Sequence, residues 1–194
     1  MINDQYKFIS VDIPRTACSA RARLFAGVPD HVFMGPDMQA WMNAVFWSDI
    51  PKHARALQYR QCASEKFESY YKYSFVRNPW DRMVSYFRYR QRKIGANDFE
   101  NYITKDEFRD LRVQQLDYLC DLKGNILVDI IGRFENLYQD FEMVCKAIGF
   151  SGKLSNQEEK IKQDYTVFYN DKTRKIVTQR FKKDIEFFGY KFGE

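Results

Sequence analysis

The chain has 194 residues, 45% hydrophobic and 29% charged, which excludes an intrinsically disordered protein and predicts a single domain over residues 1–194. A formal charge of +5, from 31 Lys and Arg against 26 Asp and Glu, suits an anionic ligand, but a nucleic-acid-binding domain is usually more basic. The four cysteines and two histidines lack zinc-site spacing, so no metal site is predicted and the thiols indicate a reducing compartment. With neither a signal sequence nor a long apolar run, we expect a cytoplasmic protein without a membrane span.

Strand-like and helix-like segments alternate through the first part of the chain. Small residues after Ile13-Pro14 predict a loop leading directly into a helix, and helix formers in Met38 to Phe46 indicate a further helix. An aromatic and β-branched run ends at Asn78-Pro79, where a strand must stop and proline suits the first turn of a helix. In order, we predict a strand over 6–12, a loop over 13–20, a helix ending near 25, helices over 51–62 and 65–70, and a strand over 71–76.

The helix that follows Pro79 is predicted to be amphipathic. Met83, Val84 and Phe87 form its apolar side, while the charged residues, Asp81, Arg82 and Arg88, lie elsewhere. The same pattern predicts later elements: helical pieces over 99–122, a buried strand over 126–131, a helix from about 133 to 148, and a last helix capped by Asp171 with Val177, Phe181, Ile185 and Phe188 on one side.

This alternation predicts a three-layer α/β fold with a mostly parallel central sheet flanked by helices. In such sheets ligands bind outside the carboxyl ends of the strands, so the loop after Asp12 and the turn at Arg77 are expected to face one crevice. Near Arg77, a guanidinium, the Ser85 hydroxyl and a helix N-terminus favour a phosphate.

The first loop, Ile-Pro-Arg-Thr-Ala-Cys-Ser-Ala, is not Gly-x-x-x-x-Gly-Lys-Ser/Thr, which disfavours an ordinary ATP-using enzyme. Together with Phe-Val-Arg-Asn-Pro-Trp-Asp-Arg-Met-Val-Ser-Tyr, it resembles the two cofactor motifs of the PAPS-dependent sulfotransferases, nearest to the carbohydrate O-sulfotransferase branch. The resemblance extends to Lys-His-Ala-Arg-Ala at 52–56, Gly-Arg-Phe-Glu-Asn-Leu at 132–137 and Lys-Asp-Ile-Glu-Phe-Phe-Gly-Tyr at 183–190, and so covers nearly the whole chain.

The resemblance implies a nucleotide-hydrolase-like sulfotransferase fold, with PAPS as sulfuryl donor and a hydroxyl, on a carbohydrate, as acceptor. The first loop would hold the 5′-phosphosulfate through Arg15, Thr16, Ala17, Cys18 and Ser19. Arg77 would pair with the 3′-phosphate as a planar fork and Ser85 would donate a hydrogen bond to it. Arg133, expected to begin a helix, would either reach the cofactor or cap that corner.

The first loop departs from the family pattern of Lys-Thr, two small residues and Thr-Ser. Arg15 replaces the lysine and can stabilise charge on the bridging oxygen as the S–O bond breaks, but it cannot donate a proton as lysine can. Ala20 lacks a hydroxyl, and Cys18 replaces a smaller residue. A catalytically silent PAPS- or PAP-binding relative is therefore the alternative, and a basic nucleic-acid-binding module is a third.

Sulfuryl transfer to an alcohol requires a base, and His53 is the candidate. We place it in the first turn of its helix, where the dipole favours the neutral ring, and family relatives carry a histidine there. A surface or capping role is the alternative. We predict that His31 lies in a loop. Glu135 is predicted to be an ion-pair partner of a nearby arginine rather than a base.

Overall fold

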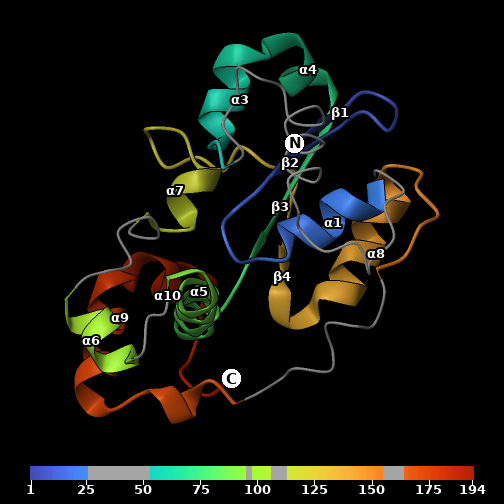
Figure 1. Ribbon diagram of the computed structural model, residues 1–194. Coiled ribbons are helices and arrows are strands. Elements are labelled where there is room, and N and C mark those ends of the chain that lie inside the picture. Colours follow the sequence, from blue (N-terminus) through green and yellow to red (C-terminus); the bar gives the residue numbers. More distant parts are fainter. Residues whose placement is uncertain (26–52, 95–97, 106–112, 155–163) are drawn as a thin grey trace. The chain divides into compact units, whose positions relative to one another are not determined.

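The computed structural model describes residues 1–25, 53–94, 98–105, 113–154 and 164–194 (Figure 1). The predicted helix over Met38 to Phe46 and His31 lie outside these residues. Contacts divide the chain into a sheet unit, Met1–Val76 with Asp117–Glu158, and a helical unit, Arg77–Leu116 with Glu159–Glu194. The single domain over residues 1–194 stays a prediction, because a division of contacts does not establish independent folding.

The sheet unit contains a four-stranded sheet in the order β1-β2-β3-β4. β1 (Ile2–Asn3) runs antiparallel to β2 (Phe8–Val11), whereas β2, β3 (Tyr71–Val76) and β4 (Ile130–Arg133) are parallel. Val11 pairs with Ser74 and Val76 with Arg133, so the three parallel strands end at the same edge of the sheet. The predicted α/β fold with a mostly parallel sheet is confirmed.

Apolar residues position these strands. Every residue of β2 is buried, as expected for a parallel strand covered on both faces. Helices α1 (Cys18–Phe25) and α8 (Leu137–Ala147) pack on the face that carries Tyr73 and Phe75, where Figure 1 shows them side by side. In the described part of this unit there are also the helices α3 (Ala56–Cys62), α4 (Ser64–Ser69) and α7 (Leu116–Leu119, which begins at the last residue of the helical unit), and the 3-10 turn η2 (Phe134–Asn136).

The third predicted strand is wrong by four residues. We expected it over 126–131, but β4 begins at Ile130 because Ile126 pairs with Cys120 across a tight turn. Asp129 then meets β3, where its carboxylate accepts the Lys72 N–H at 2.6 Å and its own N–H donates to Lys72 O at 2.8 Å. The apolar run over 126–131 is therefore divided: Ile126 forms an isolated bridge with Cys120, and the end of the run forms the start of β4.

The helical unit begins with α5 (Pro79–Ile94), and Asn78 caps it by accepting the Trp80 N–H at 3.1 Å. Proline thus occupies the first helical position, as predicted. Its other described helices are α6 (Phe99–Thr104), η4 (Thr166–Phe168), α9 (Asp171–Arg180) and α10 (Lys182–Phe188). The predicted pieces over 99–122 are therefore α6 and α7, with 106–112 outside the described residues.

One sequence prediction for this unit is wrong, and one burial was not predicted. Arg82, which we placed outside the apolar side of α5, is 1% exposed, with its guanidinium 5.9 Å from the Phe181 ring centroid. The last helix is interrupted at Phe181 and capped by Asn170, whose side chain accepts the Thr173 N–H at 2.9 Å, instead of by Asp171. Met83, Val84 and Phe87 are buried, as predicted.

Candidate active site

The loop between β2 and α1 carries two non-glycine residues in the left-handed region, Arg15 at φ 71° and Ala17 at φ 62°. Left-handed residues next to right-handed ones turn successive backbone N–H groups toward a common concavity, which binds anions. The loop leads directly into the N-terminus of α1 at Cys18. The left-handed residues and the start of a helix directly after them are both features that favour anion binding, although this loop contains no glycine.

Side chains of this loop alternate between buried and partly exposed. Arg15, Ala17 and Ser19 are partly exposed, whereas Thr16 and Cys18 are buried. The Thr16 hydroxyl donates to Ile13 O at 2.9 Å, and Cys18 Sγ donates to the same oxygen at 3.4 Å. These two side chains thus close the base of the loop, and what they would offer a ligand is their backbone.

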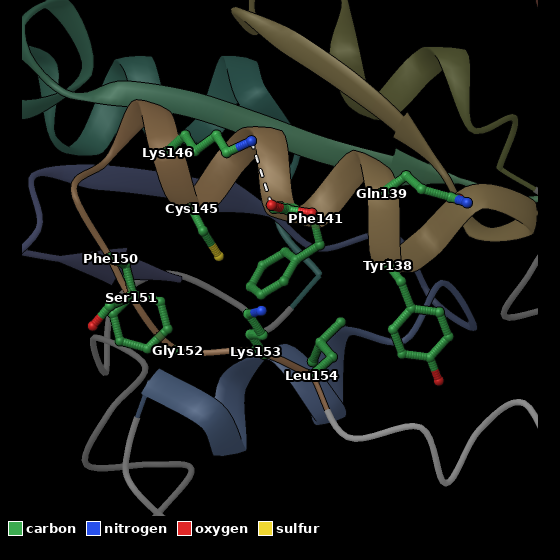
Figure 2. A pocket seen from close by; sticks show the side chains of 11 residues that line it. Tyr138, Gln139, Phe141, Cys145, Lys146, Phe150, Ser151, Gly152, Lys153 and Leu154 are labelled. Carbon is green, nitrogen blue, oxygen red and sulfur yellow. Dashed lines mark ion pairs between the residues drawn. The ribbon is translucent and has the colours of Figure 1, made fainter.

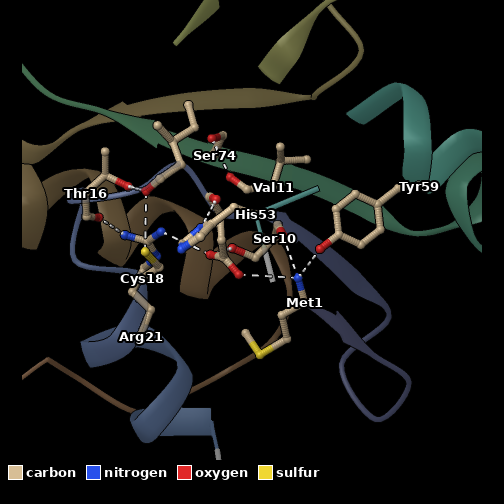
Figure 3. A network of polar contacts seen from close by, with 11 residues as sticks. Met1, Ser10, Val11, Thr16, Cys18, Arg21, His53, Tyr59 and Ser74 are labelled. Atoms are coloured by element: carbon tan, nitrogen blue, oxygen red, sulfur yellow. Dashed lines mark hydrogen bonds and ion pairs between the residues drawn. The ribbon is translucent and has the colours of Figure 1, made fainter. Parts of the chain in front are cut away.

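A buried ion pair supports the loop from below (Figure 3). Arg21 is 0% exposed, donates from Nη1 to Thr16 O, and places Nη2 3.4 Å from Asp12 Oδ1. Its guanidinium also lies 4.5 Å from the centroid of the Phe75 ring. Because a guanidinium offers several donors in a fixed plane, Arg21 fixes the Thr16 carbonyl relative to the end of β2.

Asp12 is held in its ionised form within this network. It is 1% exposed and accepts the Ser10 hydroxyl at 2.8 Å, and the Met1 amino nitrogen lies 3.3 Å from its Oδ2. Burial alone would raise the pKa of Asp12, but the charges of Met1 and Arg21, with the Ser10 hydrogen bond, hold the pKa below 3.8. Neither Asp12 nor Arg21 was singled out from the sequence; a charged residue directly at the end of an apolar strand was the available signal for Asp12.

His53 lies beside the same strand end, but our placement of it within a helix is wrong. α3 begins only at Ala56, because the chain first runs extended through Arg55, so no helix dipole acts on the ring as we argued. Instead, Nδ1 of the partly buried His53 lies 2.8 Å from Asp12 O. A carbonyl oxygen only accepts, so Nδ1 carries the proton in this contact. In the neutral form of such a ring Nε2 is the acceptor nitrogen.

Arg133 ends β4 beside Val76, at the edge of the sheet where β2 and β3 also end. We expected it to begin a helix, which is wrong, because its extended backbone (φ −106°, ψ 135°) still belongs to the strand and η2 starts at Phe134. Its N–H donates to Asp140 Oδ2 at 2.6 Å. Glu135 lies in η2 and is partly exposed.

In the helical unit, Arg77 is fixed at both its side chain and its backbone. Nε donates to Asp81 Oδ2 at 2.8 Å, and the side chain is 13% exposed. The side-chain amide of Gln115 bonds twice to the Arg77 backbone, accepting its N–H at 2.9 Å and donating to its C=O at 2.8 Å. Ser85, partly exposed, lies on α5 two turns after its start.

Gln115 is held in turn by Asp184. The two carboxylate oxygens of Asp184 accept the N–H groups of Gln115 at 2.8 Å and Leu116 at 2.9 Å, and both Gln115 and Asp184 are 0% exposed. Burial raises the pKa of Asp184 above 3.8, against the lowering effect of these backbone bonds and of Arg82. Sequence reasoning missed Gln115, which carries no local signal, and took the segment around Asp184 only as a family landmark.

The sheet unit also contains a cavity of about 340 Å³ between α8 and the segment that follows it. Figure 2 shows Phe141 and Cys145 from α8, and Phe150 and Leu154 from that segment, around it. Burial raises the pKa of Cys145 to about 11, so its thiol is not a reactive thiolate. No residue predicted for the site lines this cavity.

Among the residues that the structure describes, no cluster of three or more His, Cys, Asp or Glu side chains could hold a metal ion. None of the described helices combines the length and apolarity needed to cross a membrane.

A model of the sulfotransferase family matches residues 1–191. Carbohydrate sulfotransferase 14 of Danio rerio is 24% identical over 184 residues, which cover 77% of this chain and 48% of that protein. The human protein of the same name is 29% identical over 112 residues, or 53% of this chain and 28% of its own length. The chain thus spans about half or less of these curated relatives.

A solved structure, a sulfotransferase from Alicyclobacillus acidocaldarius, has the same fold, with a TM-score of 0.51 over 93% of this chain and 92% of that one at 15% identity. An uncharacterized protein of Archaeoglobus fulgidus is 34% identical over 92 residues, which cover 45% of this chain and 75% of that protein. The family match, the relatives and the shared fold confirm the resemblance inferred from the two motifs.

Proposed function

The chain belongs to the sulfotransferase family, and we propose that it transfers the sulfuryl group from PAPS to a hydroxyl of a carbohydrate, releasing PAP. The observation that carries this proposal is the left-handed loop before α1 with His53 anchored to the same strand end. A phosphate-binding loop and a base candidate beside it are the two parts that such a transfer requires. The carbohydrate acceptor is proposed from the names of the curated relatives.

In this proposal the first loop binds the 5′-phosphosulfate. The backbone N–H groups of the loop and the N-terminus of α1 suit an anion, and the partly exposed Arg15 and Ser19 add a cation and a hydroxyl. Arg15 would stabilise the negative charge that develops on the leaving oxygen. Thr16, whose hydroxyl donates to Ile13 O, and Cys18 would contribute through their backbone.

The 3′-phosphate would bind at Arg77 and Ser85. A guanidinium forms bidentate, charge-assisted hydrogen bonds with phosphate, and a serine hydroxyl adds a directed donor. The bond from Nε to Asp81 orients the guanidinium plane of Arg77 before any ligand arrives. Arg133 would add positive charge at the edge of the sheet. The 3′-phosphate distinguishes PAPS from ATP, so these residues would set the choice of donor.

His53 would act as the general base. Its Nε2 would take the proton of the acceptor hydroxyl as the new O–S bond forms, while the bond from sulfur to the bridging phosphate oxygen breaks and PAP leaves with that electron pair. The Nδ1–H bond to Asp12 O fixes the tautomer that this step needs. General-base catalysis of this kind contributes a factor of about 10² to 10⁴.

One observation favours a second candidate, a silent PAP-binding relative. The loop has alanine and cysteine where the family pattern has its small residues, and its threonine hydroxyl is engaged by Ile13 O. Such a protein would keep the 3′-phosphate site and lack turnover.

The cytoplasmic location that we expect from the sequence stays a prediction.

Binding and transfer assays separate these candidates. Titration with PAP, ATP and a short oligonucleotide should show tight binding of PAP alone. A preference for the oligonucleotide would contradict both the active sulfotransferase and the silent PAP-binding relative. Transfer of labelled sulfate from PAPS to a panel of glycans should then give a labelled product. PAP binding without any labelled product would favour the silent relative.

A further inference from the structure

We propose that Gln115 and Asp184 are positioning residues for the 3′-phosphate, acting through the backbone of Arg77. This inference rests on the proposed function, because it assigns a role to residues that surround Arg77 without contacting a ligand. All of its contacts lie within the helical unit. It accounts for two fully buried polar side chains that the proposed transfer does not otherwise use.

The first step is the contact between Gln115 and Arg77. Arg77 follows the last residue of β3 and precedes the first turn of α5, so its peptide groups lie between two regular elements. The Gln115 amide pairs with both its N–H and its C=O, at 2.9 and 2.8 Å. Two hydrogen bonds to the backbone of one residue fix the direction of its Cα–Cβ bond. They therefore limit the positions that the Arg77 guanidinium can reach.

The second step is the contact between Asp184 and Gln115. Asp184 accepts the consecutive N–H groups of Gln115 and Leu116, one on each oxygen, which fixes the backbone from which the Gln115 side chain extends. Gln114, the preceding residue, adds a hydrogen bond from its amide to Arg180 O. Hydrogen bonds thereby hold the segment at 114–116 against α9 and α10. Because Gln115 is in this segment, the same bonds fix the side chain that contacts the Arg77 backbone.

Contacts that fix Arg77 before phosphate binds would increase its affinity for phosphate. An arginine side chain has several rotatable bonds, and the conformational freedom that it loses in a bidentate contact with phosphate lowers the affinity, unless that freedom is already lost before binding. The Asp81 bond orients the guanidinium, and Gln115 fixes the backbone end of the same side chain. With both ends of the side chain fixed, Arg77 would lose less conformational entropy when it binds the 3′-phosphate, and the affinity would be higher.

The test measures preference for the 3′-phosphate, defined as the Kd of adenosine 5′-phosphate divided by the Kd of PAP. Gln115→Met keeps the side-chain length and removes both hydrogen bonds to Arg77. We expect this preference to fall about tenfold, since two neutral hydrogen bonds are lost, with the affinity for adenosine 5′-phosphate unchanged. Asp184→Asn, which keeps one acceptor oxygen, should lower the preference less and serves as the second variant.

A matched control and a cycle separate positioning from general destabilisation. Asn170→Ala removes the cap of α9 in the same unit and should lower thermal stability without changing the preference. In an Arg77→Ala background, Gln115→Met should have no further effect on the preference. A further drop there, or an equal loss of affinity for both nucleotides, would overturn the inference.

The outcome also distinguishes the inference from the proposed function. If the unaltered protein shows no preference for PAP, the donor assignment fails and the inference fails with it. If the unaltered protein prefers PAP and Gln115→Met keeps that preference, only the inference is overturned.

Discussion

Replacing Ala17 with glycine should stabilise this protein, although alanine to glycine normally destabilises. A left-handed backbone costs a residue with a Cβ about 1 to 2 kcal/mol, and Ala17 has φ 62°. Glycine escapes that cost but loses more backbone freedom on folding, which offsets about 0.5 to 1 kcal/mol. The partly exposed methyl group of Ala17 also packs against the core of the sheet unit, so its loss offsets a further part of the gain. The expected net gain in unfolding free energy is therefore small, up to about 0.5 kcal/mol.

The measurement is urea unfolding of the unaltered protein, Ala17→Gly and Ala147→Gly. Ala147 is exposed in the last turn of α8, in the same unit, and has no left-handed strain to lose, so its replacement should lower the unfolding free energy by roughly 0.5 to 1 kcal/mol. Opposite signs for the two variants are the prediction. If Ala17→Gly destabilises as much as Ala147→Gly, the left-handed loop and the phosphate site built on it are refuted.

Four further predictions concern the site and its support. Arg77→Ala should weaken PAP binding about 10- to 100-fold in a titration and leave ATP binding nearly unchanged, since it removes a charge-assisted contact to the 3′-phosphate; equal losses would contradict the assignment. His53→Ala should keep the Kd for PAP and reduce sulfate transfer by about 10² or more, and unchanged turnover would show that another residue is the base. Gly132→Ala should lower the unfolding free energy by about 1 to 3 kcal/mol in urea unfolding, because its Cβ would lie 2.5 Å from Cε1 of Phe75; no effect would mean that the ring has room to move. Because burial raises the pKa of Asp184 above 3.8, its stabilising contribution is full below pH 3.8 and declines as the pH rises through that raised value, so Asp184→Asn should flatten this part of the stability profile; an unchanged slope would contradict the shift.

The strand at 71–76 and the helix from Pro79 could be predicted because local chemistry decides them. An aromatic run followed by Asn-Pro can only end a strand and begin a helix, and the structure has both boundaries as expected. The loop after β2 was located by its place between a strand and a helix, but the predicted range 13–20 is too long, because α1 already begins at Cys18. The left-handed conformation of Arg15 and Ala17 had no signal, because neither residue favours it.

Contacts between distant residues decided what the sequence could not show. Arg21 and Arg82 look like ordinary exposed arginines of helices, but aromatic rings from other elements cover them. The bonds of Gln115 to Arg77 join residues 38 apart, and those of Asp184 to Gln115 join residues 69 apart. His53 was assigned to a helix because only the backbone conformation around Arg55 shows that α3 starts later.

Asp12 connects two tasks by two different parts of one residue. Its carboxylate contacts Arg21, which holds the loop, whereas its main-chain carbonyl accepts the His53 ring. A main-chain oxygen is present whatever side chain stands at that position. Substitution of Asp12 would therefore remove the carboxylate that contacts Arg21 and keep the carbonyl that accepts the His53 Nδ1–H. Because that carboxylate is also a negative charge near the ring, its removal should change the pKa of His53 while the ring stays in place.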